Sequence, residues 1–123
     1  MDDSWCDRLT SSVVRQIRRR RQIAGMSVQG LSDRCAELGY PIPRNVLAKI
    51  EGGYRKYLTL PELLVIAGAL RISVMDLLIG PDETIEVLPD SHVDRRALHV
   101  WIGLGYTDSK TYLLSLLEEA LHR

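Results

Sequence analysis

The sequence predicts an all-α fold, in which five helices form one domain and a C-terminal helical extension follows. Three observations lead to this prediction. Apolar residues recur at steps of three and four through most of the chain, which is the helical period. Residues that favour helix starts precede these segments, and glycines follow them. The chain has 123 residues, 46% of them hydrophobic, which is enough to bury a core without disulfides or metals.

Two helices are expected in the first third of the chain, at residues 8–24 and 28–38. Each has a stripe of apolar side chains at helical spacing, namely Leu9, Val13 and Ile17 in the first and Val28, Leu31, Cys35 and Leu38 in the second. Ser27 offers an N-cap to the second helix. Gly25 and Gly39 are suited to ending the two helices, because glycine readily adopts the left-handed conformation of a C-terminal cap.

Three shorter helices should follow, and each is introduced by a residue that suits a helix start. They are expected at residues 43–51, 59–70 and 73–79. Pro43 fits a first turn because proline has no amide hydrogen to leave unpaired. Thr59 and Ser73 can cap the first amides of the other two helices. Gly52 and Gly53 interrupt the helical pattern after residue 51.

The pattern changes after Gly80 and Pro81. Residues 83–89, "ETIEVLP", alternate as a short strand or an extended linker would. A sixth helix is expected from Asp90 or Ser91 to Leu104, and a seventh from Asp108 or Ser109 onward. The chain is therefore expected to contain a domain at residues 8–80, a linker at 81–90 and a C-terminal helical pair at 91–123.

The net charge is zero, but the charges are unevenly distributed along the chain. Residues 8–58 hold eleven Lys or Arg against three acids, whereas residues 59–123 hold five against ten. A basic half beside an acidic half is typical of a surface that binds a polyanion such as nucleic acid. The alternative is that the basic run Arg18 to Arg21 is only a solvated helix face.

Several classes of protein are not expected. No segment approaches the roughly 18 consecutive apolar residues of a membrane span, and the acidic start differs from an export signal, so a cytoplasmic protein is expected. The two cysteines and three histidines match no metal-ligand spacing, and no cofactor is predicted. We find neither a glycine-rich phosphate loop nor a nucleophile beside a base, so an enzyme is not expected.

Three segments carry a resemblance to a known family. They are "MSVQGLSDRCAELG" at 26–39, "LAKIEGG" at 47–53 and "LTLPELLVIAGALRISVMDLL" at 58–78. In this order and spacing they resemble the Cro/C1-type (XRE-like) helix-turn-helix DNA-binding family, over residues 14–79. The resemblance implies that the helix at 43–51 enters the major groove of double-stranded DNA, which is wide enough for one α-helix. It also implies a bacterial or phage origin and action at the nucleoid.

The resemblance implies two sets of contact residues. The base contacts would be Arg44, Asn45, Ala48 and Lys49. The phosphate contacts would be Gln29, Arg18, Tyr54, Arg55 and Lys56. The chemistry agrees, since Arg and Lys suit guanine and Asn suits adenine. Glu51 would tie its helix to a basic residue of the first helix, for which Arg18 is our candidate. The turn before residue 44 is longer than is common in the family, which leaves the register of Arg44 and Asn45 open by one residue.

The C-terminal residues hold more apolar bulk than a tail requires, including Trp101, Tyr106, Leu113 and Leu117. Such side chains could be buried against the chain's own fifth helix, a second copy of the chain or another protein. We favour a homodimer, whose two recognition helices could read a palindrome. The alternative is a second DNA-contact element in a monomer, containing Arg95, Arg96 and Lys110, as in some small phage immunity repressors that this chain resembles.

The sequence thus predicts a sequence-specific DNA-binding transcriptional regulator, and a repressor rather than an activator. The alternative from another class is a protein-interaction module, such as an antitoxin or scaffold, that binds a partner through the C-terminal helices.

Overall fold

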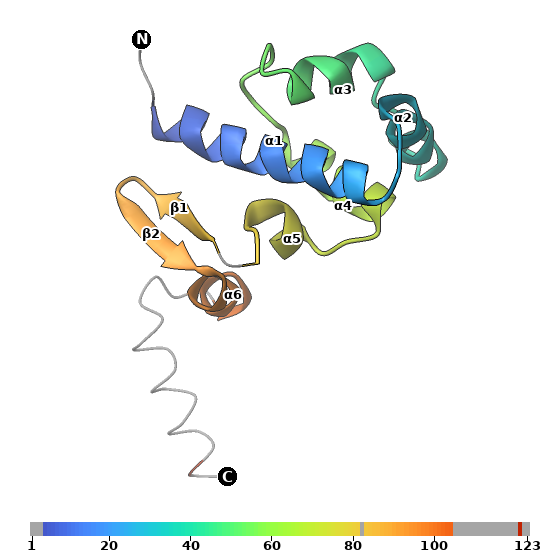
Figure 1. Ribbon diagram of the computed structural model, residues 1–123. Helices are drawn as coiled ribbons and strands as arrows, with labels where there is room; N and C mark the ends of the chain where they lie inside the picture. The colour runs from blue at the N-terminus through green and yellow to red at the C-terminus, as the bar shows by residue number, and fades with distance from the viewer. Residues whose placement is uncertain (1–3, 82, 105–120, 122–123) are drawn as a thin grey trace.

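A computed structural model describes residues 4–81, 83–104 and 121 (Figure 1). Over these residues the chain is mostly helical, with one small two-stranded sheet. The elements are α1 (Trp5–Ile23), α2 (Val28–Glu37), α3 (Arg44–Glu51), α4 (Leu60–Leu70), α5 (Val74–Leu78), β1 (Thr84–Leu88), β2 (Ser91–Asp94) and α6 (Arg95–Leu104).

The first five helices lie where the sequence predicts them, and the predicted caps of three of them form. The hydroxyls of Ser27, Thr59 and Ser73 each accept a hydrogen bond from a backbone amide in the first turn of α2, α4 and α5. One boundary is wrong. α1 begins at Trp5 rather than at residue 8, because Ser4 caps it and accepts a hydrogen bond from the amide of Asp7 at 3.2 Å.

α1 is the central element and packs against α3, α4, α5 and β1. The main core lies among the first five helices and includes the fully buried side chains Ile17, Leu31, Cys35, Leu47, Ile66 and Leu77. A second, smaller core joins the end of α5 to the sheet and α6, and consists of Ile79, Ile85 and Leu98. Leu9 and Trp101 pack against this second core and are partly buried.

The expectation of an all-α fold is corrected by a β-hairpin. β1 confirms the short strand predicted within residues 83–89, but residues 91–94 form a second antiparallel strand instead of the start of a helix. Asp90 adopts a left-handed turn with φ of 60°, which sends the chain back along β1. Val93 then pairs with Ile85, and both are β-branched. The sixth helix begins only at Arg95, where Asp94 caps it by accepting a hydrogen bond from the amide of Ala97.

The hairpin is fastened to the start of α1. The indole nitrogen of Trp5 donates to the carbonyl oxygen of Glu86 at 2.8 Å. The guanidinium of Arg8 binds both oxygens of the Glu86 carboxylate, at 2.8 and 2.9 Å, and the amide of Asp90 donates to the same carboxylate. These hydrogen bonds, first that of Arg8 and then that of Asp90, lower the pKa of Glu86 from 4.5 to about 2.

This contact predicts a dependence of stability on acid. Because the pKa of Glu86 is lower in the folded chain, its contribution to the free energy of unfolding is complete above pH 4.5 and disappears as the pH falls towards 2. Urea unfolding at several pH values should therefore find Glu86→Gln less stable than wild type at pH 7 and nearly equal to it at pH 2. The exposed Glu37→Gln is the control. If the difference in free energy of unfolding between wild type and Glu86→Gln is the same at pH 2 and pH 7, the proposed role of Glu86 is contradicted.

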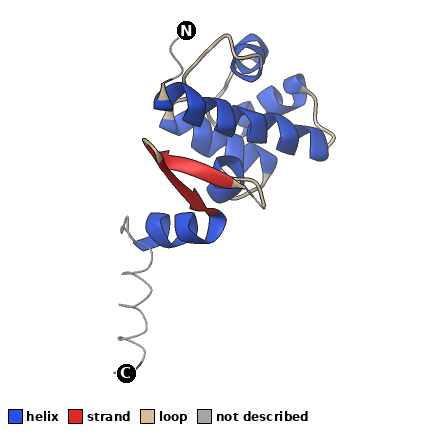
Figure 2. Ribbon diagram, turned by 60° about the vertical axis from the view of Figure 1, so that its left-hand side comes forward, coloured by secondary structure: helices blue, strands red, loops and turns tan. Residues whose placement is uncertain are grey.

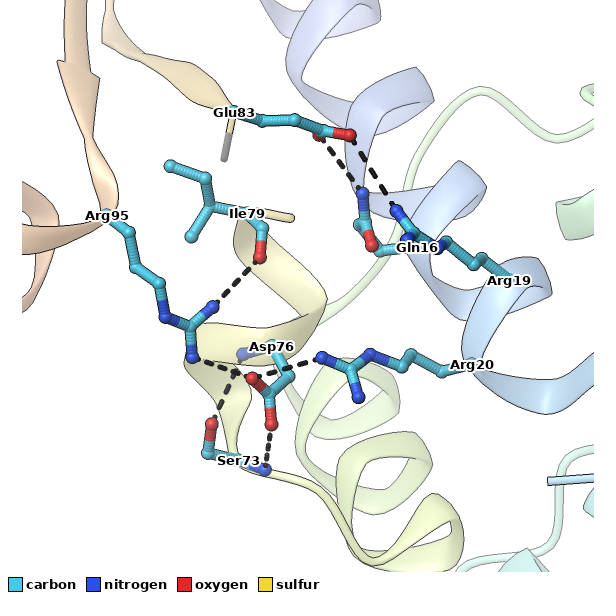
Figure 3. Close-up of polar contacts among 8 residues, drawn as sticks. All are labelled: Gln16, Arg19, Arg20, Ser73, Asp76, Ile79, Glu83 and Arg95. Carbon is cyan, nitrogen blue, oxygen red and sulfur yellow. Dashed lines mark hydrogen bonds and ion pairs between the residues drawn. The ribbon is translucent and has the colours of Figure 1, made fainter. Parts of the chain in front are cut away.

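A second polar cluster connects α6 to α5 and α1 (Figure 3). The carboxylate of Asp76 binds Arg95 at 2.7 Å and Arg20 at 3.3 Å, and Arg95 also donates to the carbonyl oxygen of Ile79. Burial by itself would raise the pKa of Asp76, but hydrogen bonds from Arg95 and Ser73 lower it below its ordinary value. The Asp76 carboxylate is therefore charged at neutral pH and holds the two cations in place.

The hairpin and α6 lie on the other side of α1 from α3 (Figure 1). After rotation of the view they again form a separate layer beneath the helices (Figure 2). The surface that α3 presents to solvent is therefore not covered by the described part of the C-terminal extension.

Candidate nucleic-acid interface

α3 has one buried side and one exposed side. Its buried side is formed by Leu47 and Ile50, which have no exposed area. Its exposed side holds the four residues predicted to contact bases: Arg44, Asn45, Ala48 and Lys49. Within the described part of the chain, no hydrogen bond or ion pair engages the three polar side chains of this set. The exposed face of α3 therefore has its donors available for a ligand.

The turn between α2 and α3 fixes where α3 begins. Ile42 is only 2% exposed, and its carbonyl oxygen accepts a hydrogen bond from the hydroxyl of the buried Ser32 at 2.6 Å. Pro43 then occupies the N-cap position, so Arg44 and Asn45 form the start of the first turn. The structure thereby fixes where α3 begins, and the register of Arg44 and Asn45 against a duplex stays a prediction.

A partly buried ion pair joins α3 to α1. Both nitrogens Nε and Nη2 of Arg21 donate to the Glu51 carboxylate, at 2.8 and 2.7 Å, and the two side chains are 12% and 8% exposed. The hydrogen bond to Glu51 raises the pKa of Arg21. The expectation that Arg18 holds Glu51 is therefore wrong by one helical turn. Arg21 lies on the face of α1 that turns towards α3, whereas Arg18 points to solvent.

The four arginines of the basic run Arg18 to Arg21 have different roles: three form ion pairs with described residues, and Arg18 is exposed to solvent. Arg19, Arg20 and Arg21 are paired with acids from three different segments, at 3.9, 3.3 and 2.7 Å. Arg18 is exposed and has no ion pair among the described residues. Much of the positive charge that the sequence displays therefore holds the fold together, and the role of Arg18 as a phosphate contact stays a prediction.

The loop after α3 contains two exposed glycines in succession, Gly52 and Gly53. Gly53 has a φ of +78°, which residues with side chains rarely adopt. A Cβ at Gly52 would lie 3.1 Å from the ring of Tyr54 and from the carbonyl oxygen of Ala48, which is too tight without a shift. The ring of Tyr54 is 86% exposed, and Lys56 is also exposed. These two predicted phosphate contacts are accessible.

Arg55, also predicted to bind phosphate, is occupied within the protein. It donates to the Glu62 carboxylate at 2.5 Å, and its guanidinium carbon lies 4.1 Å from the centre of the Tyr57 ring. Its side chain is 17% exposed. Burial by itself would raise the pKa of Glu62, but hydrogen bonds from Arg55 and Thr59 lower it. Arg55 therefore fixes the loop to α4. The other cation of this loop, Lys56, forms no ion pair with a described residue.

Gln29 does not reach α3. It is exposed near the start of α2, and its amide donates to Asp33 at 2.8 Å on the next turn of the same helix. The role of Gln29 as a phosphate contact stays a prediction. A carboxylate beside this amide also makes the position less favourable for phosphate.

A groove of about 550 Å³ separates α1 from the loop after α3. Its lining includes Asp7, Ser11 and Arg15 from α1, Gly52, Gly53 and Lys56 from the loop, and Glu51, which pairs with Arg21. The exposed Arg15 and Lys56 and the glycine backbone suit phosphate contacts, whereas the carboxylate of Asp7 in the same groove opposes them.

Comparisons with known proteins give no match to this chain, either among protein-family models or among curated proteins and solved structures. In the described part of the chain, no helix combines the length and apolar character needed to cross a membrane. The same residues contain no group of three or more potential metal ligands.

Of the residues predicted for dimerisation or a second DNA contact, Trp101 packs against the chain's own second core. Tyr106, Leu113 and Leu117 lie outside the described residues. Arg95 is held by Asp76 and Ile79, whereas Arg96 is exposed on α6. Because α6 lies across α1 from α3, a second contact element there would face away from a duplex bound to α3 (Figure 1).

Three residues that position the site were missed from the sequence. Arg21 was one of four successive arginines, and the sequence holds no sign of which one faces α3. Ser32 is a small polar residue beside an apolar stripe and looks ordinary. Glu62 did have a signal, because Thr59 and Glu62 have the spacing of a capping box, in which each side chain binds the other residue's amide.

Proposed function

We propose that this chain is a sequence-specific regulator that binds double-stranded DNA, and that it acts as a repressor. The observation that carries the proposal is the exposed face of α3, which presents Arg44, Asn45, Ala48 and Lys49 to solvent. The opposite face of the helix is apolar and buried. Arg and Lys can bind guanine, Asn can bind adenine, and the methyl group of Ala can contact thymine. These residue types together suit base recognition in a major groove.

In this proposal, α2 and α3 form a helix-turn-helix within a five-helix domain of Cro/C1 type. The buried bond from Ser32 to Ile42 and the pair of Arg21 with Glu51 support it, because both hold α3 at a fixed angle to its neighbours. A recognition helix needs such support, since its side chains must meet base edges within tenths of an ångström. α3 has eight residues and so is long enough to span a few base pairs.

The phosphate contacts of this proposal come from Lys56, Tyr54 and Arg18. All three are exposed. Such contacts fix the protein's orientation on the duplex but do not read its sequence. Repression is the simplest consequence, since a small protein that occupies an operator excludes other proteins from it. Such a regulator would act at the nucleoid of a bacterium or of a phage-infected cell.

The dependence of DNA affinity on salt tests this proposal. Each neutralised phosphate should contribute about −0.9 to the slope of log affinity against log salt concentration. We expect Lys56→Ala to weaken binding to all duplexes and to reduce the magnitude of the slope by about one. Arg55→Ala should also weaken binding, because the loop loses its tie to Glu62, but it should leave the slope nearly unchanged.

Fluorescence anisotropy with one duplex at several salt concentrations measures both variants. Equal changes of slope in the two variants would mean that Arg55 leaves Glu62 to bind phosphate. A wild-type affinity that does not respond to salt would contradict DNA binding and would favour the protein-interaction module.

A further inference from the structure

α4 carries an exposed apolar stripe. Leu60 and Leu64 are 67% and 53% exposed, while Ile66 on the opposite side of the helix is fully buried. Gly68 is also exposed. Steps of four residues place Leu60, Leu64 and Gly68 in one line on the helix surface. Two large apolar side chains and one position without a side chain therefore follow each other along the stripe.

Gly68 forms a notch in this surface. A Cβ built there would meet only the Leu38 side chain, at 3.4 Å, and no other atom within 4 Å. Leu38 itself is 55% exposed and forms an apolar wall beside the notch. The stripe thus has a projecting leucine at one end, Leu64 in the middle and an apolar depression at the other end.

We propose that a second copy of this chain covers the stripe, with the two α4 helices antiparallel and Leu64 at the twofold axis. Leu60 and Gly68 each lie four residues, or about 6 Å, from Leu64. Antiparallel pairing therefore seats Leu60 in the notch at Gly68 of the partner subunit, and the reverse contact forms by symmetry. A twofold interface requires a surface that is complementary to itself, and this arrangement of large and small positions meets that requirement.

The ends of α4 also fit this arrangement. Arg71 is exposed at the C-terminal end, and Tyr57, which is 59% exposed, precedes the N-terminal end. Antiparallel pairing brings Arg71 towards Tyr57 of the partner subunit at the rim of the interface; because the Tyr57 ring already carries the guanidinium of Arg55 at 4.1 Å, the pairing does not depend on this contact. The helix dipoles then point in opposite directions, which is favourable. None of these residues belongs to the exposed face of α3, so the pairing can be tested without DNA and independently of the proposed function.

Sedimentation of the full chain over a range of concentrations tests the interface. Wild type should form a dimer, and Leu64→Glu should raise its dissociation constant by about 30-fold or more, because two carboxylates would meet at the axis. Ile102→Glu, at a residue 52% exposed on α6, is the matched control and should leave the constant unchanged. A wild-type monomer at all concentrations, or a dimer that tolerates Leu64→Glu, would overturn the proposal.

Exchange of the projecting residue and the notch tests the antiparallel arrangement. Gly68→Leu should weaken the dimer by filling the notch, and Leu60→Ala added to it should restore the dimer. Gly68 lies within α4 with ordinary helical backbone, so both variants should fold, which circular dichroism can verify. If Gly68→Leu has no effect, or if Leu60→Ala fails to restore association, the helices do not pair in this way.

Discussion

Replacing Arg44 with alanine should relax the preference of the protein for one base pair of its site while leaving its affinity for unrelated DNA nearly unchanged. Arg44 is exposed in the first turn of α3, and no acid of the described residues neutralises it. A bidentate contact of arginine with guanine is worth about 1 to 3 kcal/mol of discrimination, which corresponds to a loss of about 5-fold to 150-fold at that position. Asn45→Ala should have the same kind of effect at a different position.

Arg18→Ala is the matched control for Arg44→Ala. Both substitutions remove one exposed arginine, but Arg18 lies on α1 and would bind phosphate. It should weaken binding to specific and unrelated duplexes by the same factor. Competition titrations with a set of singly substituted duplexes measure both effects. If Arg44→Ala weakens all duplexes equally, Arg44 contacts phosphate, and the division between base and phosphate contacts is wrong.

Replacing Glu51 with alanine should lower the free energy of unfolding by about 1 to 3 kcal/mol. The substitution leaves the partly buried guanidinium of Arg21 without the carboxylate that accepts two of its hydrogen bonds, and an unpaired group of this kind typically costs about 1 to 3 kcal/mol. This is a large share of the roughly 5 to 15 kcal/mol that stabilises a domain of this kind. Urea unfolding followed by circular dichroism measures the change.

The double variant Arg21→Met, Glu51→Met separates the loss of the charge pair from the cost of an unpaired charge. Apolar residues of similar volume often replace a buried pair at little cost in stability. We therefore expect the double variant to be much closer to wild type than Glu51→Ala. A cost of less than about 1 kcal/mol for Glu51→Ala would mean that the pair does not hold α3 against α1.

The helices were predictable because each one satisfies several local rules at once. α4 shows this clearly, since a Thr59 cap, Pro61 in the first turn and an apolar run all indicate the same element. The hairpin was only half predictable. Ser91 and Asp90 are as suitable for a helix cap as for a turn, and the choice depends on Val93 meeting Ile85 and on α1 holding Glu86. The contact between Trp5 and Glu86 joins residues 81 apart in the sequence, and a local pattern does not contain it.

The candidate site was likewise predictable only in part. The exposed face of α3 could be predicted from spacing alone, because Leu47 and Ile50 define the side that must be buried. The pairing of charges could not. Arg21 rather than Arg18 meets Glu51, and Arg55 binds Glu62 instead of pointing to solvent. Which of several neighbouring cations finds an acid depends on how the helices pack, and composition counts every cation alike.

Selection from a random duplex pool at physiological salt is the most direct test of base recognition by α3. The purified chain is mixed with the pool, and the bound DNA is recovered and sequenced. We expect an enriched motif that contains guanine and adenine, with the guanine preference lost in Arg44→Ala. A palindromic motif would agree with a dimer. If no motif is enriched while the chain remains folded, α3 does not read bases, and the function must be sought in a protein partner.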